Sequence, residues 1–100
     1  MFVGVGRYEL HIPASRSLKD KRQVLRSVSS QVSNKFNVSI AEVDHQDLWQ
    51  RAAFGVTCVA GSTGQCRRVL LEVEKAIARA AIGGAEIISR SVEVVSMDDF

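Results

Sequence analysis

Two helical segments, each placed between two strand-like segments, constrain the fold of this chain more than any other feature of its sequence. Apolar residues recur at the spacing of an amphipathic helix over residues 18–36, and again from residue 63 to the glycine pair Gly83-Gly84. Four other segments have the alternating or β-branched pattern that is typical of strands. These strand-like segments are 2–12, 38–44, 51–60 and 87–95. The predicted order of elements is therefore βαββαβ.

This order favours one α+β architecture. Crossover connections in a sheet are right-handed, and two βαβ halves around one core form a ferredoxin-like sandwich. We expect a four-stranded antiparallel sheet in the order fourth, first, third and second strand, with both helices on one face. The 100 residues, of which 46% are hydrophobic, suffice for one such core. The chain is therefore interpreted as a single domain over residues 1–100.

Basic residues gather where the first helix begins. Ser17 is the expected N-cap, and Lys19, Lys21 and Arg22 follow within the first turn and a half. The helix dipole disfavours each cation at this position by about 0.3 to 1 kcal/mol. This arrangement indicates that an anion lies nearby, either an external one or a carboxylate of the chain itself.

Lys21 differs from the neighbouring cations because it lies within the apolar stripe of the helix, three residues after Leu18 and four before Leu25. In the expected fold, the start of this helix adjoins the turn between the second and third strands. That turn carries Asp44 and Asp47. We therefore expect an internal ion pair between Lys21 and one of these two carboxylates.

Three motifs occur in order in the first half of the chain: SLKDKR at residues 17–22, FNVSIAEV at 36–43 and DLWQRA at 47–52. Together they resemble the YlxP-like family of small bacterial proteins of unknown function. The resemblance implies a ferredoxin-like fold and a cytoplasmic protein. Because genes of the family usually lie among those for translation and ribosome maturation, it also implies a connection with RNA. It implies no catalytic residues.

A basic and aromatic surface at this end of the domain is the first candidate site. Cationic side chains and free N–H groups at a helix start bind phosphates, and an indole ring stacks on a base. The hypothesis is therefore that the protein binds ribosomal RNA or a ribosomal particle. The candidate contacts are Lys19, Arg22, Arg26, Trp49 and Arg51. The alternative is that Trp49 folds over the end of the core, while Asp44 and Asp47 neutralise Lys21 and Arg22 internally.

The face of the sheet away from the helices supplies an alternative function. This face is expected to carry Val3, Val5 and Val59 beside the polar residues Arg7, Glu9 and His11, which makes part of it too apolar to be left wholly exposed. Pairing of two such faces would form a homodimer. The chain would then be a protein-interaction module.

An acylphosphatase-like hydrolase of small phosphoanions has a similar size and order of elements. Its chemistry needs a cradle of backbone N–H groups and an arginine between the first strand and the first helix, with an asparagine to position water. Arg16 lies in that connection, but Pro13-Ala14-Ser15 contains no glycine, and Asn37 is expected at the opposite end of the sheet. We therefore expect no enzymatic activity and no cofactor.

The remaining polar residues indicate no metal site. Cys58 and Cys66 lack the spacing of zinc ligands and are interpreted as free thiols, and His45 is interpreted as part of a solvated turn. No signal-peptide pattern is present at the N-terminus, and no apolar run approaches the ~20 residues that cross a bilayer. A cytoplasmic protein without a membrane partner is therefore expected, and its net charge of +2 permits a polyanion partner.

Overall fold

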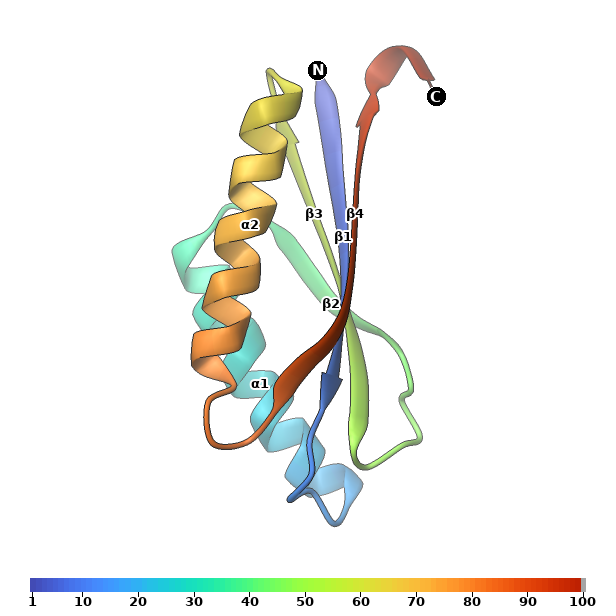
Figure 1. Cartoon of the computed structure of the whole chain (residues 1–100), viewed down its shortest axis with the longest axis vertical. Coiled ribbons are helices and arrows are strands. Elements are labelled where there is room, and N and C mark those ends of the chain that lie inside the picture. The colour runs from blue at the N-terminus through green and yellow to red at the C-terminus, as the bar shows by residue number, and fades with distance from the viewer. Residues whose placement is uncertain (100) are drawn as a thin grey trace.

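The computed structural model describes residues 1–99 as two helices packed on a four-stranded sheet (Figure 1). A short 3-10 turn, Met97–Asp99, follows the last strand. The order is the predicted βαββαβ, and every element lies within a few residues of its predicted position. The elements are β1 (Phe2–His11), α1 (Leu18–Lys35), β2 (Ser39–Asp44), β3 (Arg51–Ala60), α2 (Thr63–Ala80) and β4 (Glu86–Ser96).

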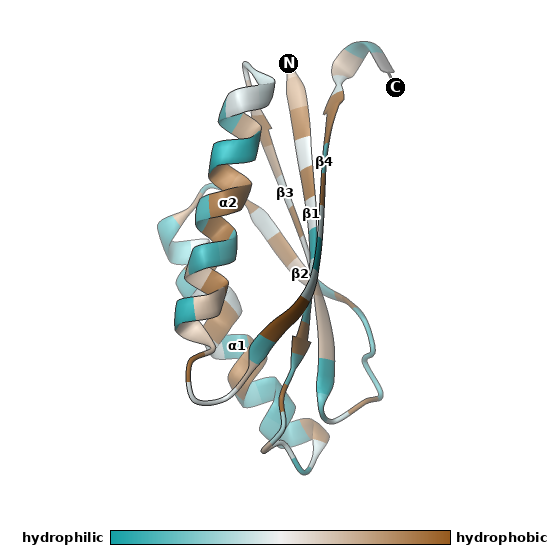
Figure 2. Cartoon of the chain, in the orientation of Figure 1, coloured by the Kyte–Doolittle hydropathy of each residue, from teal (hydrophilic) through white to brown (hydrophobic). Residues whose placement is uncertain are grey.

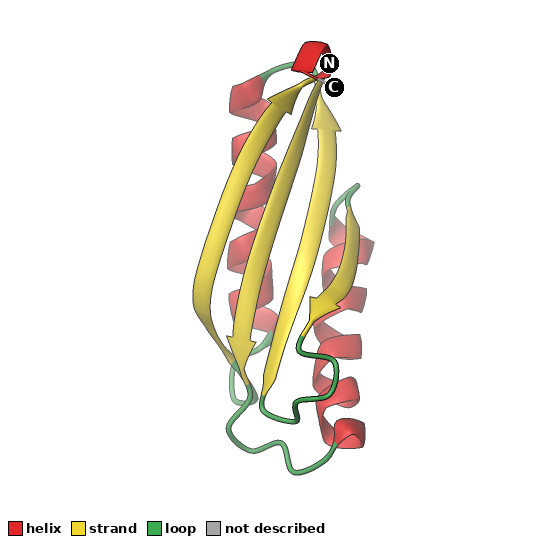
Figure 3. Ribbon diagram, turned by 90° about the vertical axis from the view of Figure 1, so that its right-hand side faces the viewer, coloured by secondary structure: helices red, strands yellow, loops and turns green. Residues whose placement is uncertain are grey.

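The sheet has the order β2-β3-β1-β4, and each neighbouring pair of strands is antiparallel. Both helices cover one face, and the opposite face, here called the open face, carries no helix (Figure 3). These observations confirm the predicted ferredoxin-like sandwich. The central strand β1 pairs along its whole length with both neighbours, so that Phe2 lies opposite both Ala60 of β3 and Ser96 of β4.

The core lies between the sheet and the helices, because alternate strand residues and one stripe of each helix are apolar (Figure 2). Tyr8 of β1 is fully buried there, and its hydroxyl donates a hydrogen bond to the carbonyl of Leu70 in α2 at 3.1 Å. Burial raises the pKa of Tyr8 to about 12. A Cβ at Gly6 would lie 2.7 Å from the Tyr8 hydroxyl oxygen, so Gly6 leaves room for this ring. A Cβ at Gly4 would lie 2.9 Å from Sγ of Cys58 and 3.0 Å from Cδ1 of Leu70, so Gly4 allows α2 to pack closely on β1.

Both helices begin at serine N-caps. Ser17 Oγ accepts from the amide of Asp20 at 3.0 Å, and Ser62 Oγ accepts from the amide of Gln65 at 3.2 Å. The Asp20 carboxylate accepts from the amide of Arg16, one residue before the cap. No helix among the described residues is long and apolar enough to cross a membrane.

A bulge in β2 orients the residues of the candidate site. The register between β2 and β3 shifts between Glu42 and Asp44. Before the shift, Glu42 lies opposite Phe54, which faces the helices. After it, Asp44 lies opposite Ala53, which belongs to the open face. The two acidic residues of β2 are therefore directed to opposite sides of the sheet.

Candidate functional site

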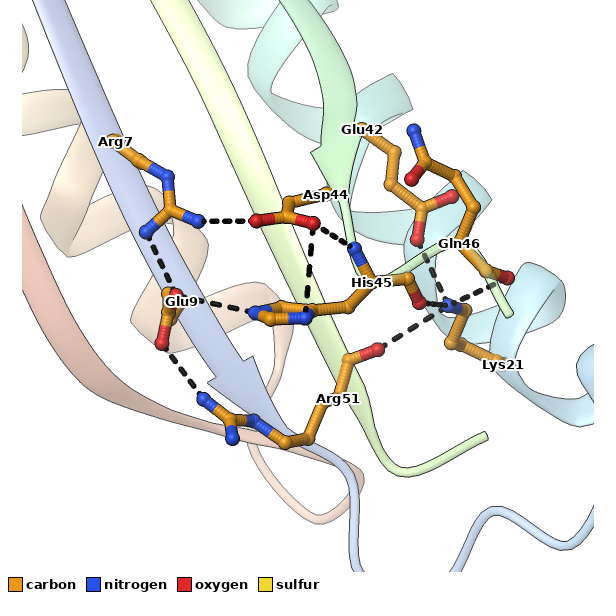
Figure 4. Close-up of polar contacts among 8 residues, drawn as sticks. All are labelled: Arg7, Glu9, Lys21, Glu42, Asp44, His45, Gln46 and Arg51. Carbon is orange, nitrogen blue, oxygen red and sulfur yellow. Dashed lines mark hydrogen bonds and ion pairs between the residues drawn. The ribbon is translucent and has the colours of Figure 1, made fainter. Parts of the chain in front are cut away.

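The ammonium group of Lys21 lies at the centre of the end of the domain where α1 begins (Figure 4). The residue is 1% exposed. Its Nζ donates to the carbonyls of His45 at 2.8 Å, Arg51 at 3.2 Å and Gln46 at 3.3 Å. It also lies 2.9 Å from Oε2 of Glu42. One side chain of α1 thus holds the end of β2, the following turn and the start of β3.

The carboxylate partner of Lys21 is Glu42, and the expectation of Asp44 or Asp47 is wrong. The bulge directs Asp44 to the open face, where it accepts from Arg7 at 3.0 Å, and Asp47 lies exposed in the turn. An ammonium has three protons, and the three carbonyls take them. Glu42 Oε2 accordingly has no hydrogen bond and serves as the neutralising charge.

A second group of charges, here called the sheet cluster, lies on the open face (Figure 4). At its centre, the Glu9 carboxylate accepts from Arg7 at 2.7 Å and from Arg51 at 2.9 Å, and lies 3.2 Å from Nε2 of His45. These contacts, led by the hydrogen bonds from Arg7 and His45, lower the pKa of Glu9 to about 2. The cluster consists of Arg7, Glu9, Asp44, His45 and Arg51.

The sheet cluster covers the small residue Ala53. This alanine lies opposite Glu9 on the open face and is nevertheless fully buried. Both arginines of the cluster form ion pairs with its carboxylates. The guanidinium of Arg51, a candidate RNA contact, pairs with Glu9. The cluster therefore acts as a self-neutralised cap on this part of the sheet.

His45 joins the two groups of charges. Its backbone has φ of 61°, in the left-handed region. Its amide donates to the Asp44 carboxylate at 2.8 Å, which is the main cause of a lowered Asp44 pKa. Its carbonyl accepts from Lys21 and from the amide of Leu48. Within residues 1–99, no group of three or more His, Cys, Asp and Glu side chains could hold a metal ion.

Three exposed cations of α1 differ from those of the sheet cluster because they have no carboxylate partner among the described residues. Lys19, Arg22 and Arg26 lie on one side of the helix, turned away from Lys21. In the part of the chain that the structure describes, none of these three side chains has an ion pair with a carboxylate. Arg22 and Arg26 also line a groove of about 260 Å³ between α1 and β2.

Trp49 lies in the turn between β2 and β3 and is 54% exposed. The interpretation that it folds over the core is therefore wrong. Residues 47–51 line an open hollow of about 440 Å³ beside it. The neighbouring Gln50 fixes this turn to the connection between β1 and α1, because its Nε2 donates to the carbonyls of Pro13 and Ser15.

Comparison with known sequences gives two matches to proteins without an assigned function. The family described as "Protein of unknown function (DUF503)" matches residues 3–92. The uncharacterized protein YlxP of Bacillus subtilis (strain 168) is 44% identical over 71 residues, which cover 71% of this chain and 77% of that protein. The match with YlxP confirms the resemblance found from the three sequence motifs.

Comparison with solved structures concerns the fold alone. A de novo designed protein with a ferredoxin fold has a TM-score of 0.53 at 15% identity, over 97% of this chain and 88% of that one. A C-terminal segment of the alpha subunit of aIF2 from Pyrococcus abyssi has a TM-score of 0.52 at 14% identity, over 95% of this chain. The chain covers only 51% of the length of this second protein.

Lys21→Met is expected to lower the free energy of unfolding by about 3 to 5 kcal/mol. The substitution leaves the Glu42 carboxylate, and the three carbonyls that accept from Lys21, without this partner in a buried site. Urea denaturation measures this change. Lys19→Met, at an exposed position of the same helix turn, is the matched control and is expected to change it by less than about 0.5 kcal/mol. Adding Glu42→Leu to Lys21→Met should recover part of the loss. Equal effects of the two single substitutions would contradict this account of Lys21.

The low pKa of Glu9 predicts a loss of stability in acid. Its pKa is about 2 in the folded chain and 4.5 as the ordinary value, so folding favours the ionised form. This contribution is complete above about pH 4.5 and is lost as the pH falls from there towards 2. Urea midpoints at pH 7 and pH 3 should therefore differ less for Glu9→Gln than for the wild type. Glu93→Gln, on the same face but outside the sheet cluster, should keep the wild-type difference.

Proposed function

The chain belongs to the DUF503 family of proteins of unknown function, and we propose that it binds RNA, as ribosomal RNA or within a ribosomal particle, in the cytoplasm. The contact surface is the one formed by Lys19, Arg22, Arg26 and Trp49, here called the helix-start surface. Arg51, which the sequence also suggested as a contact, serves in this proposal to hold the turn through Glu9.

The observation that supports this proposal is the division of the cations at this end of the domain. Lys21, Arg7 and Arg51 each have a carboxylate partner within 3.0 Å. The three cations of the helix-start surface are exposed, and no ion pair involves them among the described residues. Lys19 lies in the first turn of α1, where the helix dipole disfavours a cation, and a bound phosphate group would offset that penalty.

The surface also has the composition that nucleic-acid binding needs. Phosphates bound by cations release counterions, which gives an affinity that falls steeply with salt. An exposed indole offers a stacking platform for a base, worth about 1 to 3 kcal/mol. The Lys21 contacts hold the turn that carries Trp49 against the start of α1, so the ring lies at the same end of the domain as the first cations of the helix.

We expect the double substitution Lys19→Glu and Arg22→Glu to weaken binding to ribosomal RNA by at least about tenfold, because two phosphate contacts become repulsive. Filter binding over a salt series measures this, and the slope of log affinity against log salt should fall by about 1.4 to 1.8. Co-sedimentation with ribosomal subunits extends the test to the particle.

The matched control is Arg67→Glu with Arg68→Glu, which makes the same change of charge near the start of α2, at the opposite end of the molecule (Figure 1). This control is expected to retain most of the affinity. Equal losses in both variants would contradict a localised site. An affinity that remains millimolar at low salt for the wild type would contradict RNA binding itself.

A second candidate function, self-association through the open face, is favoured by exposed branched side chains on the sheet. Val5, Val43 and Val59 are 45%, 49% and 64% exposed. Val5 and Val59 lie on the two central strands, and Val43 lies against Gly55, whose partner Arg7 is also on the open face. Two such faces could cover each other in a dimer with twofold symmetry.

Sedimentation equilibrium tests this second candidate. If the open faces pair, Val59→Glu should convert a dimer into a monomer, because it would place two carboxylates in the interface. Ile82→Glu, at a 78% exposed position in the turn after α2, should leave the dimer intact. A wild-type chain that remains monomeric at high concentration would exclude self-association as a function of this face.

A further inference from the structure

The hollow beside Trp49 has a rigid frame. The side chain of Gln50, the residue after Trp49, is fixed to the carbonyls of Pro13 and Ser15. The Gln50 carbonyl also accepts from the amide of Ile12 at 2.8 Å. Next to it, the carbonyl of Arg51 accepts from Lys21. A pocket whose frame is held in advance binds a ligand at a lower cost in conformational entropy.

The side chains that line the hollow and remain available are Trp49 and Asp47. The indole is 54% exposed. Asp47 is exposed too, and within residues 1–99 its carboxylate takes part in no hydrogen bond or ion pair. Leu48 adds an apolar surface that is 46% exposed. The hollow thus combines a flat aromatic ring, an apolar wall and a carboxylate that accepts hydrogen bonds.

We propose that this hollow binds an unpaired guanine base, stacked on Trp49 and recognised by the carboxylate of Asp47. The proposal rests on the proposed function and adds a preferred base to it. The volume of the hollow, about 440 Å³, is sufficient for one base. The exposed indole of Trp49 offers a stacking surface to a base that is not stacked on its neighbours in the RNA.

The chemistry of a carboxylate selects guanine among the four bases. An ionised carboxylate only accepts hydrogen bonds. Guanine offers two parallel donors, N1–H and an N2 hydrogen, on one edge, and these match the two oxygens of a carboxylate. Uracil has a single N3–H between two carbonyls that would repel the carboxylate. Adenine and cytosine each have an amino group next to a ring nitrogen that is an acceptor.

An unpaired base is required because the edge in question is the one used in Watson–Crick pairing. Single-stranded loops and bulges present this edge, whereas a duplex hides it. The cations of the helix-start surface would then bind phosphates elsewhere in the same RNA. The ligand class that follows is a single-stranded RNA segment containing a guanine, within a larger structured RNA.

The experiment uses the intrinsic fluorescence of Trp49, which is the only tryptophan of the chain and therefore reports on this hollow alone. The probes are four RNA pentamers, AAGAA, AAUAA, AACAA and AAAAA. We expect AAGAA to quench the fluorescence at a concentration about tenfold lower than the others, the factor typical of a good bidentate contact to a base. Asp47→Asn should abolish this preference and leave the affinity for the other three pentamers unchanged.

The charge-reversal variant Lys19→Glu with Arg22→Glu separates this inference from the proposed function. It should weaken all four pentamers by the same factor and keep the preference for guanine. Equal quenching by the four pentamers, or a preference that survives Asp47→Asn, would overturn the recognition of guanine. Absence of quenching, with salt-dependent binding of ribosomal RNA intact, would overturn the base site and leave RNA binding in place. Quenching by AAGAA without binding of ribosomal RNA would support the hollow and contradict the proposed function.

Discussion

The contacts of a single buried ammonium hold together the end of the molecule where the candidate site lies. Lys21 is the point at which α1, the last residues of β2, the following turn and the start of β3 meet. Backbone carbonyls that are buried but not paired within a sheet need other hydrogen-bond donors. An ammonium group supplies three N–H donors at one point. The conformation of the turn, including the left-handed His45, depends on this arrangement. So does the position of Trp49.

Hydrophobic periodicity was sufficient to predict the order of the elements and the sheet topology, because each element buries one face against the same core. The partner of Lys21 was not predicted, although the sequence contains a signal for it. Glu42 has the same strand parity as Ile40, which packs on the core, and this parity directs it towards the helices. Asp44 would share that direction if β2 were regular. The bulge turns Asp44 to the open face, and no residue type in the strand predicts a bulge.

The sheet cluster illustrates a different limit of sequence analysis. Arg7 and Glu9 alternate with buried residues of β1, which is the ordinary pattern of a solvated strand face. The pattern gives no indication that both would meet His45 and Arg51 from other parts of the chain, since this depends on the register and on the bulge. The different directions of Lys21 and of the three cations of the helix-start surface could be predicted from the sequence, because a helix turns by a fixed angle per residue. Lys21 faces inward, and Lys19, Arg22 and Arg26 cannot share that direction.

The central position of β1 has a consequence for the synthesis of the chain. Strand β1 is synthesised before both of its partners: it pairs with β3 on one side and with β4 on the other, and Phe2 lies opposite Ser96. One edge of β1 therefore stays without a partner until β4 has left the ribosome. Contacts between such distant segments close slowly, and an open strand edge is a template for pairing with other chains. The interval between the appearance of β1 and the arrival of β4 is thus the period in which a nascent chain of this topology is most exposed to aggregation.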